Sequence, residues 1–240
     1  MPRFAYFSIF AIIATSPPVL CQETESPQAP AVTLDLFVMS QCPWGAAAED
    51  VADDLRDIFG QRLKINIFYI VSEADDSEQA ETKEPDPTGA SDFQSLHGQT
   101  EVRENMRQLI IQKHFPEKFW DYLNSRNTDY RSSEWQPHAL FVGIEPAAIE
   151  EKMNAGEGAE LLRQNLDTQK AGERWKTGDE QWQRPQASPT IFVNGSKYAG
   201  PLGLPQLAVA INRNIDQPEK KLERLPACYS DRDCTDSTQA

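Results

Sequence analysis

The alternation of apolar and polar positions predicts a strand–helix–strand unit near the start of the chain. Val32–Met39 is almost continuously apolar, which is typical of a strand buried on both faces. From Pro43 to Gly60, apolar residues recur every three or four positions and predict an amphipathic helix; they are Ala47, Val51, Leu55 and Ile58. Leu63–Val71 predicts a second buried strand. Because such crossovers are nearly always right-handed, we expect the two strands to be parallel.

The middle third of the chain has the periodicity of helices. An acidic stretch without periodicity, 72–90, predicts a loop before it. Helical spacing of apolar residues returns over 91–122 and again over 146–170, where Gly156 and Gly158 predict a break. We therefore expect a helical insertion at about 91–182, inside a single domain that spans 32–216.

A hairpin and a closing helix follow the insertion. Asn194-Gly195 lies between two extended runs, and both residues of such a turn take a positive φ, so the pair is a strong hairpin signal. Asn194-Gly195-Ser196 is also a glycosylation sequon, but the tight turn is the reading we favour. Pro205–Ile215 predicts a final helix, with proline at a tolerated first-turn position.

Both ends of the chain differ in composition from this domain. Residues 1–21 have the pattern of an export signal: Arg3, the apolar run Phe4–Ala14, and a cleavage site after Cys21. A lipid anchor on Cys21 is the alternative, which the bulky Leu20 fits poorly. Residues 22–31 form a polar, proline-containing linker, and 217–240 form a polar tail. The chain is therefore expected to act outside the cytoplasm, in the periplasm, a lumen or the secreted medium.

Charge limits the kinds of partner the protein can bind, and length limits the number of its domains. The formal net charge is -14 and the pI is near 4.7, so the chain lacks the clustered cations that nucleic acids and anionic membranes attract. We expect neither partner. Beyond the signal, no segment is apolar enough to span a membrane. With 240 residues, the chain is expected to build one core rather than two.

Three cysteines would remain after cleavage of the signal. Cys228 and Cys234 lie close enough in sequence to close a small loop through a disulfide, which leaves Cys42 as the odd cysteine. A structural disulfide that pins the tail is the simpler reading. The alternative is that Cys228 or Cys234 serves as a distant resolving thiol for Cys42.

Cys42 stands where a strand ends and a helix begins, in the turn Ser40–Gly45. The free backbone N–H groups and the dipole of the helix start favour a thiolate at that position. A buried, inert thiol is the alternative, but a core cysteine seldom lies in a Cys-Pro-aromatic-Gly turn. We therefore expect Cys42 to be nucleophilic.

This order of elements, with Cys-Pro at a helix start and Ser188-Pro189-Thr190 before a hairpin, resembles the thioredoxin superfamily, in particular its periplasmic disulfide-exchange members with inserted helices. The resemblance implies an α/β thioredoxin fold, a central mixed sheet with flanking helices and an inserted helical subdomain. It also implies that Pro189 is cis and packs against the active-site turn. Cys42 would be the nucleophile, and a substrate would contact Pro43, Trp44, Ser188 and Pro189.

A second, partial resemblance concerns residues 95–105. Ser95-Leu96-His97-Gly98-Gln99-Thr100-Glu101-Val102-Arg103-Glu104-Asn105 is similar to the signature of the gamma-interferon-inducible lysosomal thiol reductase family, Cys-Gln-His-Gly-x-x-Glu-Cys-x-x-Asn. The residues that match are His97, Gly98, Glu101 and Asn105. The cysteines of the signature are replaced by Ser95 and Val102, and Ile110 replaces a further one. We therefore interpret His97 as structural rather than catalytic.

Gly45 is the main departure from a dithiol enzyme. Such enzymes resolve their mixed disulfide with a second cysteine three residues after the first, and Gly45 closes that route. The sequence therefore predicts a monothiol exchange or isomerase activity on a cysteine-containing protein or peptide. The alternative is a redox-inactive binding or chaperone-like module. No cofactor is expected, and His97, His114 and His138 have no partner at metal spacing, so no metal site is expected either.

Overall fold

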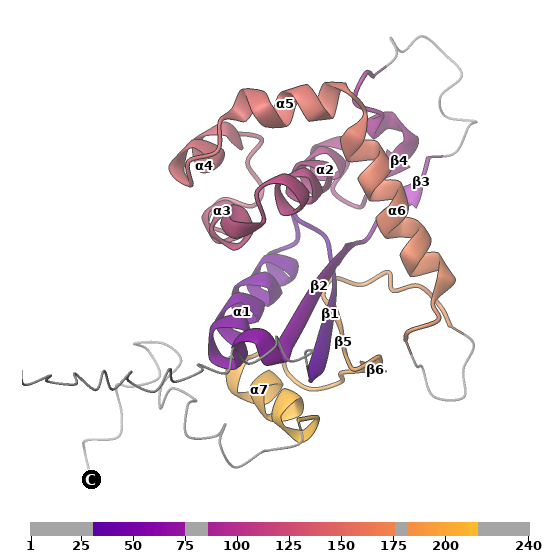
Figure 1. Cartoon of the computed structure of the whole chain (residues 1–240). Coiled ribbons are helices and arrows are strands. Elements are labelled where there is room, and N and C mark those ends of the chain that lie inside the picture. Colours follow the sequence, from indigo (N-terminus) through magenta and orange to yellow (C-terminus); the bar gives the residue numbers. More distant parts are fainter. Residues whose placement is uncertain (1–30, 75–85, 176–181, 216–240) are drawn as a thin grey trace, which may run out of the picture.

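The computed structural model describes residues 31–74, 86–175 and 182–215, and its centre is a four-stranded sheet in the order β2-β1-β5-β6 (Figure 1). β1 (Val32–Val38) and β2 (Leu63–Tyr69) are parallel, as predicted, and are joined by α1 (Pro43–Phe59). β5 (Thr190–Val193) runs antiparallel to β1. α7 (Leu204–Arg213) follows the hairpin and closes the fold.

The predicted hairpin is formed by β5 and β6 (Ser196–Lys197). Asn194 and Gly195 have φ values of 49° and 75°, as the turn requires. A Cβ on Gly195 would lie 2.2 Å from the carbonyl oxygen of Arg174, so only glycine fits there. The Asn194 side-chain oxygen accepts a hydrogen bond from the Thr33 N–H at 2.8 Å, which ties the turn to the start of β1.

The two faces of the sheet are covered differently. Alternate residues of β1 point to opposite faces, so Leu34 and Leu36 join the large core under α1 and α7. Phe37 faces the other way, into a smaller aromatic cluster with Phe68 and Trp175. This second cluster also contains Cys42, so the candidate nucleophile packs on the aromatic face.

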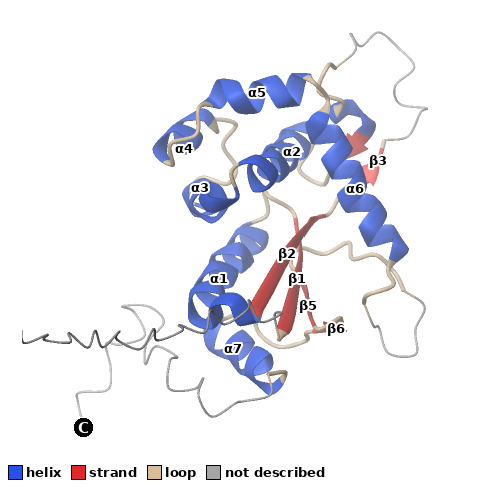
Figure 2. Cartoon of the chain, in the orientation of Figure 1, coloured by secondary structure: helices blue, strands red, loops and turns tan. Residues whose placement is uncertain are grey.

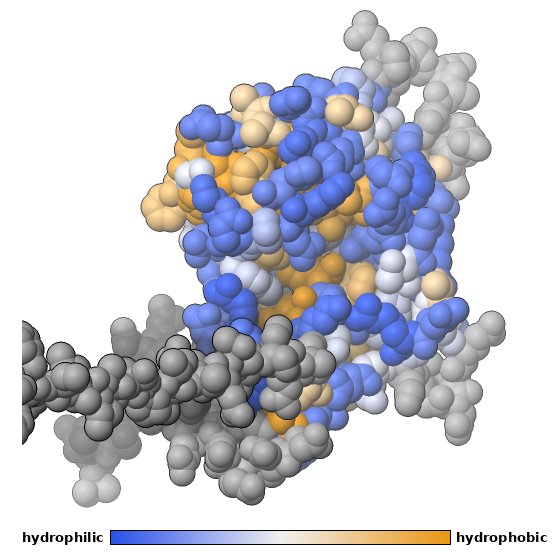
Figure 3. All heavy atoms as spheres, viewed as in Figure 1, coloured by the Kyte–Doolittle hydropathy of each residue, from blue (hydrophilic) through white to orange (hydrophobic). Residues whose placement is uncertain are grey.

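The helical insertion lies at one end of the sheet (Figure 2). Its helices are α2 (Gln99–His114), α3 (Phe119–Asn127), α4 (Gln136–Phe141), α5 (Pro146–Asn154) and α6 (Glu157–Ala171). The predicted break between α5 and α6 occurs at Gly156, which has a left-handed φ of 78°. Figure 3 shows a mostly polar face on which hydrophobic atoms gather over α3 and α4.

The segment before α2 corrects two expectations. Ser72–Glu73 was expected in a loop, but it forms β3, which pairs with β4 (Phe93–Gln94). The start of the predicted helix, 91–98, is instead a short 3-10 turn, β4 and a further turn. Leu96, which contributed to the helical spacing, lies in the turn after β4 and is 78% exposed, so it does not belong to the buried face of α2. α4 had no predicted counterpart.

α6 protects the outer edge of β2. Asn165 accepts a hydrogen bond from the Tyr69 N–H at 3.0 Å and donates one to the carbonyl oxygen of Ile67 at 3.2 Å. Gln169 donates to the carbonyl oxygen of Tyr69 at 2.9 Å. Two amide side chains therefore satisfy backbone groups that a neighbouring strand would otherwise bind.

Several sequence-based expectations lie outside the described residues. They are the export signal 1–21 with Cys21, residues 22–30 of the linker, and the tail with Cys228 and Cys234. Among the helices in the described part of the chain, none has both the length and the apolar character needed to cross a membrane.

Candidate active site around Cys42

Cys42 caps the amino end of α1. It has an extended backbone, with φ -88° and ψ 127°, and its carbonyl oxygen accepts the first hydrogen bond of the helix from Ala46 N–H at 2.9 Å. The Cys42 N–H donates to the carbonyl oxygen of Met39 at 3.0 Å, which closes the turn after β1. Cys42 is 9% exposed, whereas Trp44 beside it is 67% exposed. The thiol is thus largely covered, next to an exposed indole.

The segment before β5 lies against this turn. The Ser188–Pro189 peptide bond is cis, as the resemblance implies. The Cys42 thiol donates to the carbonyl oxygen of Ser188 at 3.6 Å, and the Met39 N–H donates to the Ser188 Oγ at 2.9 Å. Cys42 and Ser188, 146 residues apart in sequence, therefore meet at one site.

Gly45 occupies the position of a resolving cysteine, and the structure leaves no space for a side chain there. A Cβ on Gly45 would lie 2.7 Å from the carbonyl oxygen of Met39 and 2.8 Å from the Ser188 Oγ. Contacts this short require the backbone of the turn to shift. The same Ser188 hydroxyl that holds Met39 thus also fills the space that a residue larger than glycine would need.

A buried carboxylate connects the insertion to the active-site turn. Glu101, in the first turn of α2, is fully buried and accepts the N–H of Gln41 at 2.8 Å. It also accepts the His97 N–H at 3.3 Å, lies 2.9 Å from the His97 Nδ1, and accepts a hydrogen bond from the Ser95 hydroxyl. Sequence analysis identified Glu101 only as a matching position in a signature, and Gln41 not at all.

The signature positions in α2 and in the turn before it have separate roles. Ser95 and His97 bind Glu101, whereas Val102 and Ile110 are fully buried apolar residues. Buried apolar side chains therefore stand at two of the positions at which the signature has cysteine. Asn105 is fully buried, and neither polar atom of its side chain has a hydrogen-bond partner in the described part of the chain.

The fold of the chain is similar to that of known structures. Across 78% of its length the chain superposes on BdbD from Bacillus subtilis in its oxidised form, with a TM-score of 0.55, 14% identity and 89% of that chain covered. The chain has a thioredoxin fold. A periplasmic thioredoxin-like protein from Salmonella enterica serovar Typhimurium gives a TM-score of 0.53 at 13% identity, over 79% of this chain and 87% of that one. No family model and no curated protein matches the sequence.

Within this thioredoxin fold, a second cluster of buried polar side chains lies between α1, β2, α2 and α3. It includes Glu49, Tyr69, Glu104 and Tyr122. Burial pushes the pKa of Glu104 upward, but Arg107 and Arg126 outweigh burial and hold it below its usual value. Burial raises the pKa of Glu49, on α1, to about 8, and Asp50 and Glu104 add to the rise. Asn127 lies close enough to lower the pKa of Glu49. Its side-chain amide, however, donates to the carbonyl oxygen of Ala46 and to Asp50, not to Glu49, so the rise in the pKa prevails.

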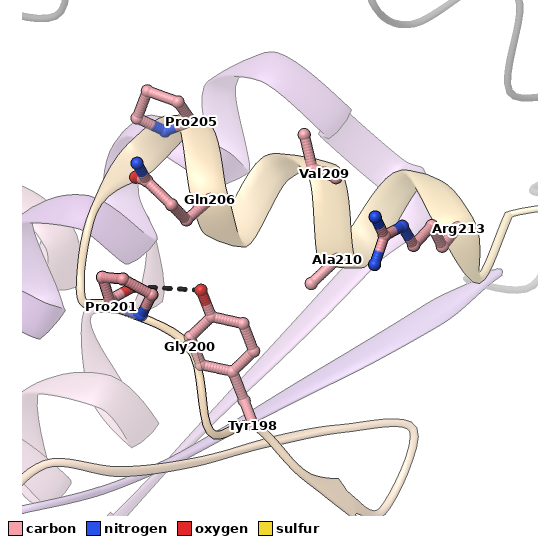
Figure 4. Close-up of a pocket in the computed structure, with 8 residues that line it drawn as sticks. All are labelled: Tyr198, Gly200, Pro201, Pro205, Gln206, Val209, Ala210 and Arg213. Atoms are coloured by element: carbon pink, nitrogen blue, oxygen red, sulfur yellow. Dashed lines mark hydrogen bonds between the residues drawn. The ribbon is translucent and has the colours of Figure 1, made fainter.

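Of two hollows on the surface, one lies next to the turn that holds Cys42 and one lies away from it. One, of about 260 Å³, is bordered by Met39, the residue that binds the Cys42 N–H. The other, of about 510 Å³, lies along α7, where Tyr198 donates to the carbonyl oxygen of Pro201 at 2.9 Å (Figure 4). Among the described residues, no group of three or more histidine, cysteine, aspartate or glutamate side chains is placed to bind a metal.

Proposed function

We propose that the protein carries out thiol–disulfide exchange through Cys42 alone. The observation that carries the proposal is the meeting of the Cys42 thiol, at the amino end of α1, with the carbonyl oxygen of Ser188 before the cis-proline. Disulfide exchange needs a cysteine sulfur that can reach a substrate disulfide, and Cys42 stands at the start of α1 beside exposed Trp44. The thioredoxin fold supports this choice, and the similar Salmonella protein is described as thioredoxin-like.

The proposed chemistry has two steps. The Cys42 thiolate attacks one sulfur of a substrate disulfide and forms a mixed disulfide, while the other sulfur leaves as a thiolate and takes up a proton. A second thiol must then attack the mixed disulfide to release Cys42. Because Gly45 carries no thiol, we propose that this thiol comes from the substrate itself, which gives isomerisation, or from a small external thiol.

The proposed substrate is a cysteine-containing protein or peptide. Pro43 and Trp44, which follow Cys42, are exposed, and Ser188, which precedes the cis-proline Pro189, accepts the hydrogen bond of the Cys42 thiol. We propose that these four residues contact the substrate chain. The peptide groups just before the cis-proline are the part of the site that can pair with an extended strand.

We further propose that the activity is extracytoplasmic. The sequence of residues 1–21 supports export, and the similar Salmonella protein is described as periplasmic. Outside the cytoplasm, disulfides form and persist, so an exchange protein would find its substrates there.

The test is trapping of the mixed disulfide. The chain without residues 1–21 is mixed with a disulfide-bonded peptide in the absence of added thiol, and the products are analysed by mass spectrometry. We expect one peptide to become attached at Cys42, with net reduction of the peptide disulfide over several turnovers only after reduced glutathione is added. Cys42→Ser should abolish attachment, and the matched control Cys228→Ser/Cys234→Ser should not change it. Turnover without added thiol, lost in that control, would instead identify a resolving cysteine in the tail.

A redox-inactive binding or chaperone-like module is the second candidate. The observation that favours it is the low exposure of Cys42, 9%, together with the closed position at Gly45. Binding of unfolded peptides that survives Cys42→Ala, with no mixed disulfide in the wild type, would establish this function in place of exchange.

A further inference from the structure

The hollow beside Met39 has an apolar floor and uncharged sides. Met39, Ile70 and Val71 form its floor, and Ser95, Leu96 and Gln186 are among the residues at its sides. None of the described residues that line it carries a charge. Its volume of about 260 Å³ is below the roughly 300–1,000 Å³ of sites for whole small-molecule ligands. The hollow therefore fits one uncharged side chain better than a cofactor.

The hollow borders the candidate active site through Met39. Met39 contributes to its floor and also binds both sides of the site, through the Cys42 N–H at 3.0 Å and the Ser188 Oγ at 2.9 Å. Gln186, at the other side, precedes Ser188 by only two residues. A substrate that reaches Cys42 along the Ser188 backbone would therefore pass the hollow.

Leu96 at the edge of the hollow is 78% exposed. The residues on both sides of it are fixed, because Ser95 and His97 each bind the buried carboxylate of Glu101. The same carboxylate holds the N–H of Gln41, next to Cys42. An exposed leucine is thus held in a defined position relative to the nucleophile, so a partner would not need to order a loose loop in order to cover it.

We infer that this hollow is a subsite for an apolar side chain adjacent to the reacting cysteine of the substrate. The inference rests on the proposed function and adds a preference to it: peptides with leucine-like residues beside the cysteine would be favoured. Leu96 and the floor of the hollow would lose contact with water when the substrate side chain enters, which is the source of the preference.

The test compares two peptides. Each is offered as its mixed disulfide with glutathione, one with leucine and one with serine on both sides of its cysteine, and oxidised glutathione serves as the baseline substrate. We expect the leucine peptide to exchange about tenfold faster, as burial of one apolar side chain allows. Two variants test the hollow: Leu96→Ser removes an apolar residue at its edge, and Ser72→Phe fills it with a larger side chain. Each should reduce the ratio of the leucine rate to the serine rate to about twofold and leave the rate with oxidised glutathione unchanged.

The control variant is Phe141→Ser, because Phe141 on α4 is 82% exposed but does not line this hollow. It should retain the tenfold preference. A preference that is absent in the wild type, or that persists in both Leu96→Ser and Ser72→Phe, would overturn the subsite. Equilibrium binding of the leucine peptide with its cysteine replaced by serine gives a second readout. If the wild type does not exchange with oxidised glutathione, the proposed function fails. In that case the subsite is still supported if the wild type binds the leucine peptide and Leu96→Ser does not.

Discussion

Glu104 and Glu49 lie in the same buried polar region, but their surroundings differ in almost every respect. Glu104 has Arg107, Arg126 and the Tyr122 hydroxyl within hydrogen-bonding distance, and its carboxyl group stays ionised with a lowered pKa. Neither carboxyl oxygen of Glu49 has a hydrogen-bond partner in the described chain, and its pKa is raised to about 8. Equal burial therefore leads to opposite charge states, because the neighbours decide whether a buried carboxylate is compensated.

Glu101 extends this comparison to the candidate active site. It is as deeply buried as Glu49, yet its oxygens accept hydrogen bonds from Ser95, His97 and Gln41. Within the described part of the chain, α2 thus carries two buried glutamates with hydrogen-bond partners, and α1 carries one without. Removing each carboxylate in turn measures what its partners contribute.

The largest effect is expected for Glu104→Gln. The substitution leaves the buried guanidinium of Arg126 without its counter-charge, and breaking a buried ion pair in this way costs about 3–5 kcal/mol. Urea unfolding of the variant would measure the loss. Glu150→Gln, at an exposed position of α5, is the matched control and should stay within about 0.5 kcal/mol of the wild type. A loss below 1 kcal/mol for Glu104→Gln would contradict the role given to the ion pairs.

Glu101→Gln is expected to have an intermediate effect. The amide keeps the size of the side chain but replaces one acceptor oxygen with an N–H donor, so one of the buried donors that face Glu101 loses its acceptor, and a loss of about 1–3 kcal/mol in stability is expected. If the carboxylate positions the turn, alkylation of Cys42 by iodoacetamide should also change in rate. Glu104→Gln provides the control here, because it is destabilised more but does not touch Gln41. Equal alkylation rates in wild type and Glu101→Gln would limit Glu101 to a structural role.

An effect of opposite sign, a stabilisation at neutral pH, is expected for Glu49→Gln. Glu49 titrates near 4.5 when unfolded and near 8 when folded, so between these values the folded state holds a proton that the unfolded chain has lost. The free energy of unfolding of the wild type should therefore fall as the pH rises, by about 1 kcal/mol between pH 7 and pH 8. The variant should lack this part of the pH dependence.

The measurement for Glu49 is urea unfolding at pH 5, 7 and 8. Asp57→Asn, which removes a carboxylate on α1 that is 74% exposed, is the control and should keep the pH dependence of the wild type. An identical pH profile for Glu49→Gln and wild type would show that Glu49 is ionised in the folded protein. In that case the contrast with Glu104 would disappear.

The elements that local periodicity determines were predicted well. β1, α1 and β2 follow from which positions along the chain are apolar, and the β5–β6 turn follows from the need of Asn194-Gly195 for positive φ. β3 and β4 were missed because each has only two residues, too few to show a period. The length of α2 was overestimated at its amino end for the same reason, since a short strand and a turn cannot be told from a helix start by apolar content.

The sequence alone therefore determined the fold class and the placement of Cys42 at a helix start, because both depend on patterns within a few residues. Only the tertiary structure decided what surrounds the thiol. Ser188 reaches it from 146 residues away, Glu101 binds Gln41 across 60 residues, and the closeness of Met39 and Ser188 to Gly45 leaves no space for a second cysteine. Periodicity specifies that a residue is buried, whereas the partner it meets depends on how distant elements pack.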